Sequence, residues 1–263
     1  MQPPDCPVSD ITTYPVLLHG FTGSSQAWGP RIVDGLAGAK LPPVLVDLPG
    51  HGKEVDRVDP ARFTLDATLG SISAAGVWPT DLVGYSMGAR IALHFAVAHP
   101  DRIRRLVLES GSPGLEGESE RESRRAADEA LAARLVADGV EAFVDFWENQ
   151  PLFETRRALP AETWAYQRAL RMRNDAASLA AALTALGTGS LPSLWDRLPG
   201  LATPTLLLVG ELDAKFVDIA ERMAASMPDA TVVVVPDAGH TVHVERPAAW
   251  LEAVTGFLSA PPR

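Results

Sequence analysis

Short runs of β-branched residues and leucine recur along the chain, each followed by a turn and a helix-like pattern. They are "YPVLLHG", "PPVLVDLPGHG", "TDLVGYSMG", "IRRLVLESGS", "TPTLLLVGE" and "TVVVVPDAGH". Continuous apolar strands of this kind are buried on both faces, as in a parallel sheet that is covered by helices. The pattern therefore predicts an α/β fold with a mainly parallel central sheet flanked by helices.

The spacing between these runs is uneven. Most are separated by the length of one βαβ crossover, but roughly 90 residues separate "LVLESGS" from "TLLLVGE". Helix-like stretches fill this gap near 119–138, 139–149, 161–173 and 175–187. Because ligands bind at the carboxyl ends of parallel strands, a helical insertion placed there is a natural lid. We predict a core formed by 1–112 and 191–263, with a helical lid at 113–190.

Composition and charge narrow the choice of partners. The 263 residues fit one α/β domain with an insertion, and 46% apolar with 21% charged residues is ordinary for a globular protein. The net charge of −10 argues against a nucleic-acid partner, which needs a basic face. Only three of the 23 basic residues are lysines, so nearly all the positive charge is arginine, which binds carboxylates bidentately.

The ends and the cysteine content predict a cytoplasmic protein. Cys6 is the only cysteine, so no internal disulfide can form. The start "MQPPDCPVSD" lacks the basic and apolar regions of a secretory signal, and no run of about 18 apolar residues is present. We therefore expect neither secretion nor a membrane partner.

The stretch "VGYSMGAR" contains a G-x-S-x-G pentapeptide centred on Ser86. The pentapeptide alone is weak evidence because it also arises by chance. Here it follows the apolar run "TDLV" and precedes the helical pattern "RIALHFAVAHP", which is the strand, sharp turn and helix of a nucleophile elbow. The two glycines let strand and helix approach closely while the hydroxyl projects at the tip. We predict that Ser86 is the catalytic serine.

A catalytic serine needs a base, and histidine is the usual one. His240, in "PDAGHTVHVERP", follows the last predicted strand, where a loop can reach back across the sheet edge. We choose it over five other histidines, which are His19, His51, His94, His99 and His243. Of these, His94 and His99 lie on the predicted helix after the serine and are expected to pack or lie on the surface, and His243 is expected to flank the loop.

The base in turn needs a carboxylate that orients it. Asp213, in "LLLVGELDAKF", follows the preceding strand and lies between the serine and the histidine in the chain. Glu211 on the same turn is the local alternative. Asp47 precedes the serine, and we expect it to order its own loop. The predicted triad is Ser86, Asp213 and His240.

An oxyanion site requires two backbone N–H donors that point at one position. Met87 begins the helix after the serine, where the helix dipole is also favourable. The stretch "LHGFTGSSQAW" offers a second donor, which we assign to Phe21, although His19 and Gly20 could also be plain turn residues. Arg90 lies four residues after the serine, about one helical turn along and on the same face, so its guanidinium can reach the pocket mouth.

With "LHGFTGS", "DLPGHG", "GYSMG", "GELDAKF" and "AGHTVHVERP" in order, the chain resembles the α/β-hydrolase superfamily over nearly its full length. Only about 15 residues precede "VLLHG", so the first two strands of that superfamily are expected to be short or partly missing. A narrower resemblance rests on "GYSMGAR", "ESGSPGLEGESERESRRAADEALA", "FVDFWENQPLF", "LRMRND", "GTGSLPSLWDRL" and "GELDAKF". Together these are similar to the 2-succinyl-6-hydroxy-2,4-cyclohexadiene-1-carboxylate synthases of menaquinone biosynthesis.

This resemblance implies a lyase that needs no metal and no cofactor. It would eliminate pyruvate from the polyanionic substrate 2-succinyl-5-enolpyruvyl-6-hydroxy-3-cyclohexene-1-carboxylate, with the serine, polarised by the histidine, removing a ring proton. The residues that match the substrate-binding positions of the family are Tyr85, Arg90, Arg124, Trp147, Phe153 and Arg171. The lid arginines also have neighbours that blur the register, namely Arg125, Arg168 and Arg173, and surface ion pairs are the alternative role for Arg124 and Arg171.

Two other interpretations stay open at this point. A carboxylesterase or carbon–carbon bond hydrolase would use the same triad through an acyl-serine and would give the arginines no role. A receptor that binds a ligand without catalysis would have no use for an intact triad. Because one constellation serves several reactions, fold alone cannot choose between them. The sequence does not indicate an oligomeric state.

Overall fold

Six parallel strands form the central sheet of the computed structural model, which describes residues 14–54 and 59–261. The strand order is β2-β1-β3-β4-β5-β6, and every neighbouring pair is parallel. The strands are β1 (Val16–Leu18), β2 (Val44–Val46), β3 (Thr80–Tyr85), β4 (Ile103–Glu109), β5 (Thr205–Gly210) and β6 (Ala230–Val235). They coincide with the six apolar runs, which confirms the predicted fold class.

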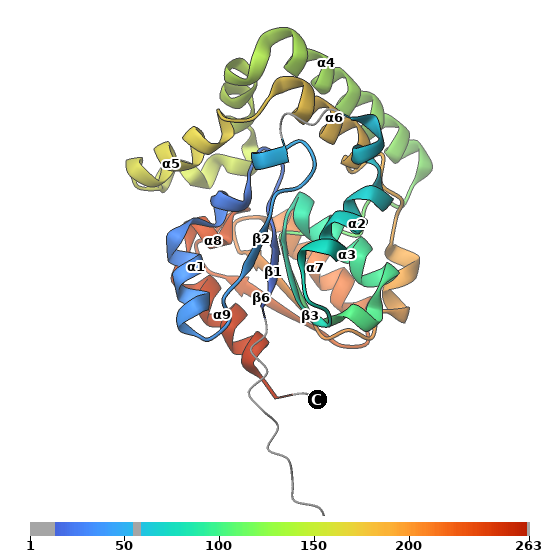
Figure 1. Cartoon of the computed structure of the whole chain (residues 1–263), viewed down its shortest axis with the longest axis vertical. Coiled ribbons are helices and arrows are strands. Elements are labelled where there is room, and N and C mark those ends of the chain that lie inside the picture. The colour runs from blue at the N-terminus through green and yellow to red at the C-terminus, as the bar shows by residue number, and fades with distance from the viewer. Residues whose placement is uncertain (1–13, 55–58, 262–263) are drawn as a thin grey trace, which may run out of the picture.

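Helices cover both faces of this sheet, as Figure 1 shows. One face packs against α1 (Gly29–Gly38), α8 (Val242–Glu245) and α9 (Pro247–Ser259), and its core includes Trp28, Leu36 and Trp250. The other packs against α2 (Leu65–Ala75), α3 (Met87–Ala98) and α7 (Ala214–Ser226), around Ile91 and Phe95. Short 3₁₀ turns complete the core: η1 (Ser25–Trp28), η2 (Gly52–Glu54), η3 (Pro60–Phe63), η4 (Pro100–Arg102) and η6 (Trp195–Gly200).

A helical layer lies above the carboxyl ends of the strands, between β4 and η6 (Figure 1). It consists of α4 (Glu118–Glu148), η5 (Pro151–Ala158), α5 (Ala161–Arg171) and α6 (Ala176–Leu186). The sequence predicts two helical stretches that meet near residue 139, and α4 is interrupted there because Gly139 has a φ of 82°. We refer to this layer as the lid.

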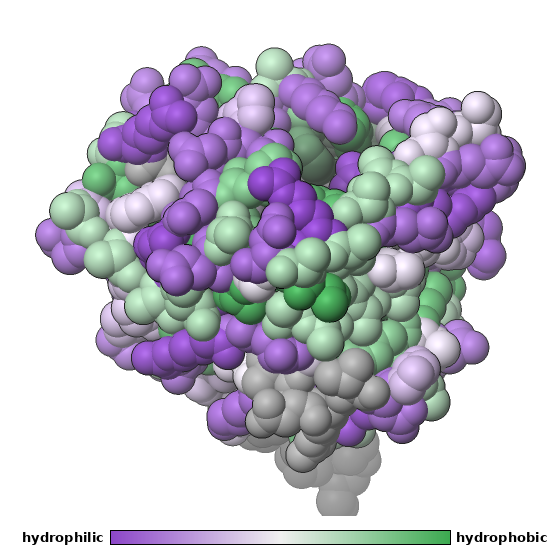
Figure 2. All heavy atoms as spheres, turned by 90° about the horizontal axis from the view of Figure 1, so that it is seen from above, coloured by the Kyte–Doolittle hydropathy of each residue, from purple (hydrophilic) through white to green (hydrophobic). Residues whose placement is uncertain are grey.

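The lid has a small apolar core of its own. Leu135, Phe143 and Leu183 are buried between α4 and α6, with Phe21 of the sheet layer and Trp147 packed against them. Burial of this apolar face holds the two lid helices together and anchors them on the core beside the serine. Seen from above, the outer face is largely hydrophilic with scattered hydrophobic side chains (Figure 2).

In the described part of the chain, no helix is long and apolar enough to cross a membrane. Cys6 and the expectation of shortened first strands concern residues outside the described ones.

Candidate active site

Ser86 lies on a sharp turn between β3 and α3. Its φ of 52° and ψ of −108° fall where non-glycine residues are strained by about 1–3 kcal/mol. The flanking glycines make the turn possible, since a Cβ on Gly84 would lie 2.5 Å from the Gly88 carbonyl oxygen and one on Gly88 would lie 2.2 Å from that of Leu18. The Ser86 N–H donates to the Glu109 carbonyl on β4 at 2.9 Å. The sheet thus holds the turn with its hydroxyl above the strand ends.

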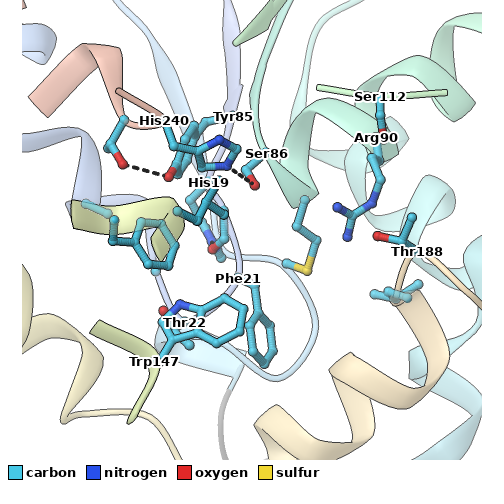
Figure 3. A pocket seen from close by; sticks show the side chains of 18 of the residues that line it. His19, Phe21, Thr22, Tyr85, Ser86, Arg90, Ser112, Trp147, Thr188 and His240 are labelled. Atoms are coloured by element: carbon cyan, nitrogen blue, oxygen red, sulfur yellow. Dashed lines mark hydrogen bonds between the residues drawn. The ribbon is translucent and has the colours of Figure 1, made fainter. Parts of the chain in front are cut away.

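The three residues of the predicted triad meet above the sheet. Ser86 Oγ lies 3.0 Å from His240 Nε2, and His240 Nδ1 lies 2.6 Å from Asp213 Oδ2. Asp213 directly precedes α7, and His240 lies in the loop between β6 and α8. The tautomer that fits both contacts has Nδ1–H donating to the carboxylate, which leaves Nε2 free to accept the serine proton. Figure 3 shows the hydrogen bond between Ser86 and His240.

The turn after β1 carries the second predicted oxyanion donor, Phe21. The Gly23 N–H donates to the Gly20 carbonyl at 3.0 Å, which closes a tight turn around Phe21 and Thr22. His51 Nε2 accepts from the Thr22 N–H at 3.2 Å, and Asn174 of the lid donates to the Thr22 carbonyl at 2.8 Å. Both the core and the lid therefore hold this turn beside Ser86.

Two neutral histidines support the same turn. His19 Nε2 accepts from the Leu48 N–H at 3.0 Å, and burial lowers its pKa. Burial and the neighbouring His19 lower the pKa of His51 to about 3. Because each ring accepts a backbone proton, each must be neutral to do so. These two competitors for the role of base are thus engaged in shaping the turn.

A cavity of about 410 Å³ lies between the strand ends and the lid. Every residue that the sequence predicts for the site lines it except Asp213, which lies behind His240. Phe21 and Met87 lie at its floor on the two predicted oxyanion segments, and Met87 begins α3, where amide groups lack intrahelical partners. The size suits a small organic ligand.

Arg90 lies across Ser86 from His240, between Ser112 and Thr188 (Figure 3). Its Nε is buried without a hydrogen-bond partner, and its guanidinium forms no ion pair with the described residues. Burial, and then the nearby Arg124, lower its pKa to about 10 against the opposing effect of the Asp128 carboxylate, so it stays charged at neutral pH. A partly buried cation without a directly paired carboxylate is costly. This arrangement can hold an anionic ligand.

The two lid arginines line the same cavity but already have carboxylate partners. Arg124 Nε donates to Asp128 Oδ1 at 2.8 Å, and burial raises the pKa of Asp128. Arg171 donates to Glu148 at 2.9 Å, and both side chains are buried. The cavity and ion-pair interpretations of these arginines therefore both apply. Of the neighbours that blurred the register, Arg168 also pairs with Glu148, and neither Arg125 nor Arg173 lines the cavity.

Aromatic side chains form the wall opposite Arg90. Trp147 contacts Phe21 edge to face with ring centres 5.4 Å apart, and Phe153 contacts the His240 ring at 6.0 Å. Tyr85 lines the cavity, and its hydroxyl is 2.9 Å from Thr241 Oγ1. All three residues thus face the space where the resemblance implies substrate contacts, and Figure 3 shows Trp147 beside Phe21.

The chain matches the model of the alpha/beta hydrolase family over residues 16–254. The chain belongs to the α/β-hydrolase family. A Klebsiella pneumoniae (strain ATCC 700721 / MGH 78578) 2-succinyl-6-hydroxy-2,4-cyclohexadiene-1-carboxylate synthase is 35% identical, over 93% of both chains. A Bacillus subtilis (strain 168) protein that carries the same name provisionally is 39% identical, over 93% of this chain and 90% of its own. The chain thus belongs to the synthase branch of this family.

Solved structures agree with this grouping. MenH from S. aureus has a TM-score of 0.85 and 34% identity, over 94% of this α/β-hydrolase and 93% of its own chain. A thermophilic esterase from Thermogutta terrifontis, solved with malate bound, has a TM-score of 0.77 and 30% identity, over 94% and 90%. The same scaffold therefore carries both a synthase branch and esterases.

The alternative residues have other roles in this α/β-hydrolase. Asp47 accepts from the Ser25 and Lys53 N–H groups and orders its loop, as expected. Glu211 is exposed and accepts from the Asp237 N–H, so it does not contact His240. His94 is buried on α3, where burial and Arg90 lower its pKa to about 4.

Sequence reasoning missed several residues that surround the site. His243 was expected to flank the loop, but its Nδ1 lies 2.8 Å from the buried Glu109 carboxylate and it lines the cavity. Ser112, Thr188, Lys215 and Phe216 also line the cavity. All of them lie in stretches that carry the family resemblance, among them "GELDAKF" for Lys215 and Phe216, but nothing in those stretches showed which side chains face the cavity. The described residues contain no group of three His, Cys, Asp or Glu side chains that could hold a metal ion.

Proposed function

We propose that this protein is a lyase that converts 2-succinyl-5-enolpyruvyl-6-hydroxy-3-cyclohexene-1-carboxylate into 2-succinyl-6-hydroxy-2,4-cyclohexadiene-1-carboxylate and pyruvate. The relatives named for the product support the reaction class. The observation that carries the proposal in this chain is Arg90, whose Nε is buried without a hydrogen-bond partner and which lines the same cavity as Ser86 and His240 of the assembled triad. A neutral ester would leave that cation without a directly paired counter-charge, since the nearby Asp128 is paired with Arg124.

In the proposed mechanism, the triad acts as a base. His240 Nε2 takes the hydroxyl proton of Ser86, and the Ser86 oxygen removes a proton from the substrate ring. The freed electron pair forms a double bond between ring carbons 2 and 3, the existing double bond shifts from carbons 3 and 4 to carbons 4 and 5, and the carbon–oxygen bond to the enolpyruvyl group at carbon 5 breaks. The leaving group departs as the enolate of pyruvate and takes up the proton held by His240, while Ser86 keeps the ring proton as its hydroxyl. Asp213 keeps the His240 ring in the tautomer that accepts the serine proton.

Charge develops on the conjugated carbonyl oxygen of the substrate as the ring proton leaves. The Phe21 and Met87 amides are our proposed donors to that oxygen, on the two segments that meet beside Ser86. The helix dipole of α3 adds to the stabilisation at Met87.

Carboxylates on the substrate give the arginines their role. Arg90 would hold one carboxylate directly, while Arg124 and Arg171, each paired with a carboxylate of its own, line the same cavity and add to its positive charge. Tyr85, Trp147 and Phe153 would enclose the ring and exclude water. We include a cytoplasmic location in the proposal, supported by the single cysteine of the chain.

The test supplies the enolpyruvyl precursor and follows pyruvate release. We expect turnover by the wild type, loss of turnover in Ser86→Ala, and wild-type turnover in Ser123→Ala, which alters an exposed lid serine outside the cavity. No pyruvate release by the wild type, or release undiminished in Ser86→Ala, would rule the proposal out.

A carboxylesterase is the second candidate, because Ser86 Oγ already lies 3.0 Å from His240 Nε2 and an esterase shares the scaffold. It predicts rapid turnover of p-nitrophenyl esters that is unaffected by Arg90→Met. A non-catalytic receptor is excluded by any turnover that depends on Ser86.

A further inference from the structure

The backbone around His240 is held by a buried carboxylate. Glu245 lies at the end of α8 with 7% of its surface exposed, and its side chain turns back toward the loop. Glu245 Oε2 accepts from the Gly239 N–H at 2.7 Å, and Oε1 accepts from the Thr241 N–H at 3.0 Å. The N–H groups of the two residues on either side of His240 are therefore tied to one carboxylate.

The rest of the loop leaves His240 little freedom. Ser110 Oγ donates to the His240 carbonyl at 2.9 Å. Thr155 of the lid packs on the loop so closely that a Cβ on Gly239 would lie 2.1 Å from its hydroxyl oxygen. The loop is thus covered by the lid on one side. Glu245, the last residue of α8, supplies the two carboxylate oxygens that accept the loop N–H groups.

Only a carboxylate satisfies both donors well. Each oxygen accepts one N–H, and hydrogen bonds to a charged acceptor are shorter and stronger than neutral ones. A glutamine would offer one acceptor and would point its amide group at the other N–H. Rotation of either flanking peptide would tilt the imidazole, which must reach Ser86 and Asp213 at the same time.

We propose that Glu245 is a positioning residue that keeps His240 in register with Ser86 and Asp213. It does not touch substrate and acts through the loop. This inference goes beyond the proposed function, because it applies to any reaction in which His240 serves as the base. The competing explanation is that Glu245 merely caps α8, since its own N–H and carboxylate both bond to Thr241, at the N-cap of that helix.

The test compares Glu245→Gln and Glu245→Leu with Glu252→Gln, a control on an exposed position of α9. The first readout is the rate at which a fluorophosphonate ester modifies Ser86, which requires His240 but no natural substrate. We expect a fall of about tenfold in Glu245→Gln, a larger fall in Glu245→Leu and none in the control. Thermal unfolding and circular dichroism establish that each variant is folded.

A second readout separates positioning from capping. The proton between His240 Nδ1 and Asp213 Oδ2, a 2.6 Å contact, gives a low-field proton NMR signal that is assigned by its loss in His240→Ala. The His243 contact with Glu109 at 2.8 Å serves as an internal reference in the same spectrum. We expect the His240 signal to shift or broaden in Glu245→Gln while the reference stays in place, with the KM for the precursor unchanged and kcat reduced.

An unchanged His240 signal with a phosphonylation rate within twofold of the wild type would overturn the proposal. So would an equal change of both signals, which indicates general loosening of the fold. If Glu245→Leu fails to fold, the near-isosteric Glu245→Gln decides the matter. If the wild type reacts with the phosphonate but releases no pyruvate, the proposed function fails while this inference is still tested.

Discussion

Replacing Arg90 should move activity and stability in opposite directions. The Arg90→Met substitution keeps a long unbranched side chain on α3 but removes a charge that forms no direct ion pair with the described residues, although Asp128 lies near enough to favour it. The lowering of its pKa to about 10 corresponds to at most roughly 3 kcal/mol by which the fold disfavours the charged guanidinium, because the side chain is partly exposed. Methionine carries no such cost, so the free energy of unfolding should rise by up to about 3 kcal/mol.

The same substitution removes the proposed anchor for a substrate carboxylate. Hydrogen bonds to charged groups contribute about 1.5–3 kcal/mol, and 2–3 kcal/mol corresponds to a loss of about 30- to 150-fold in kcat/KM. The assay measures pyruvate release at several precursor concentrations, together with denaturant unfolding of the free protein. Arg197→Met, at an exposed position of η6, controls for the change in net charge.

Two results would refute this reasoning. If kcat/KM of Arg90→Met stays within threefold of the wild type, the guanidinium does not hold substrate. If activity and the free energy of unfolding fall together, Arg90 stabilises the fold, and its charge is not the cost to the free protein that we infer.

Three further predictions concern the triad, the turn that carries Phe21 and the Arg90 end of the cavity. Asp213→Asn should lower kcat by about 10³-fold or more while the protein stays folded, because the amide no longer selects the His240 tautomer; a loss below tenfold in pyruvate release would contradict this. The pKa of His51 is about 3 in the fold against an ordinary 6.5, so between those values the unfolded chain binds a proton that the folded chain does not, and stability falls as pH drops. At pH 5 this removes about 2 kcal/mol relative to pH 8, and the loss should shrink in His51→Gln when unfolding is measured at both pH values; equal losses in both proteins would show that another group is responsible. Ser112→Ala and Thr188→Val should each raise the KM for the precursor about tenfold or more with little change in kcat, as expected for one hydrogen bond from a hydroxyl to a charged carboxylate, and unchanged KM values would remove these hydroxyls from the site.

The sheet could be predicted from the sequence because its strands are buried on both faces. Each strand then appears as a continuous apolar run, and the turns that follow carry their own markers, such as the glycines around Ser86. Gly139 likewise marked the interruption of α4, since the helix-like stretches before and after it meet there. Local pattern was sufficient for these features because local conformation and burial decide them.

The ion pairs between different elements of the site could not be predicted in this way. Asp128 is four residues from Arg124, and that pair follows from helical spacing. Glu148, in contrast, pairs with Arg171 on another helix, and Glu109 meets His243 across 134 residues of sequence. Such partners depend on how the layers pack. The sequence therefore indicated which arginines face the cavity but not that Arg90 alone among the three lacks a carboxylate.

The hydrogen bonds from the residues beside His240 to Glu245 were partly predictable from the sequence. Glu245 follows the histidine by five residues and was visible in "AGHTVHVERP". Its side chain direction, however, depends on the short α8 that turns it back toward Gly239 and Thr241. The sequence therefore placed Glu245 near His240 but did not predict its hydrogen bonds.

The central claim is that Ser86 acts as a base in an elimination and not as a nucleophile. Rapid quenching of a single turnover, with intact-protein mass spectrometry and parallel measurement of pyruvate and the conjugated diene, tests it most directly. We predict that pyruvate and diene appear at the same rate and in equal amounts while the enzyme mass stays unchanged. A covalent adduct on the Ser86 peptide, or pyruvate without the diene, would contradict the mechanism.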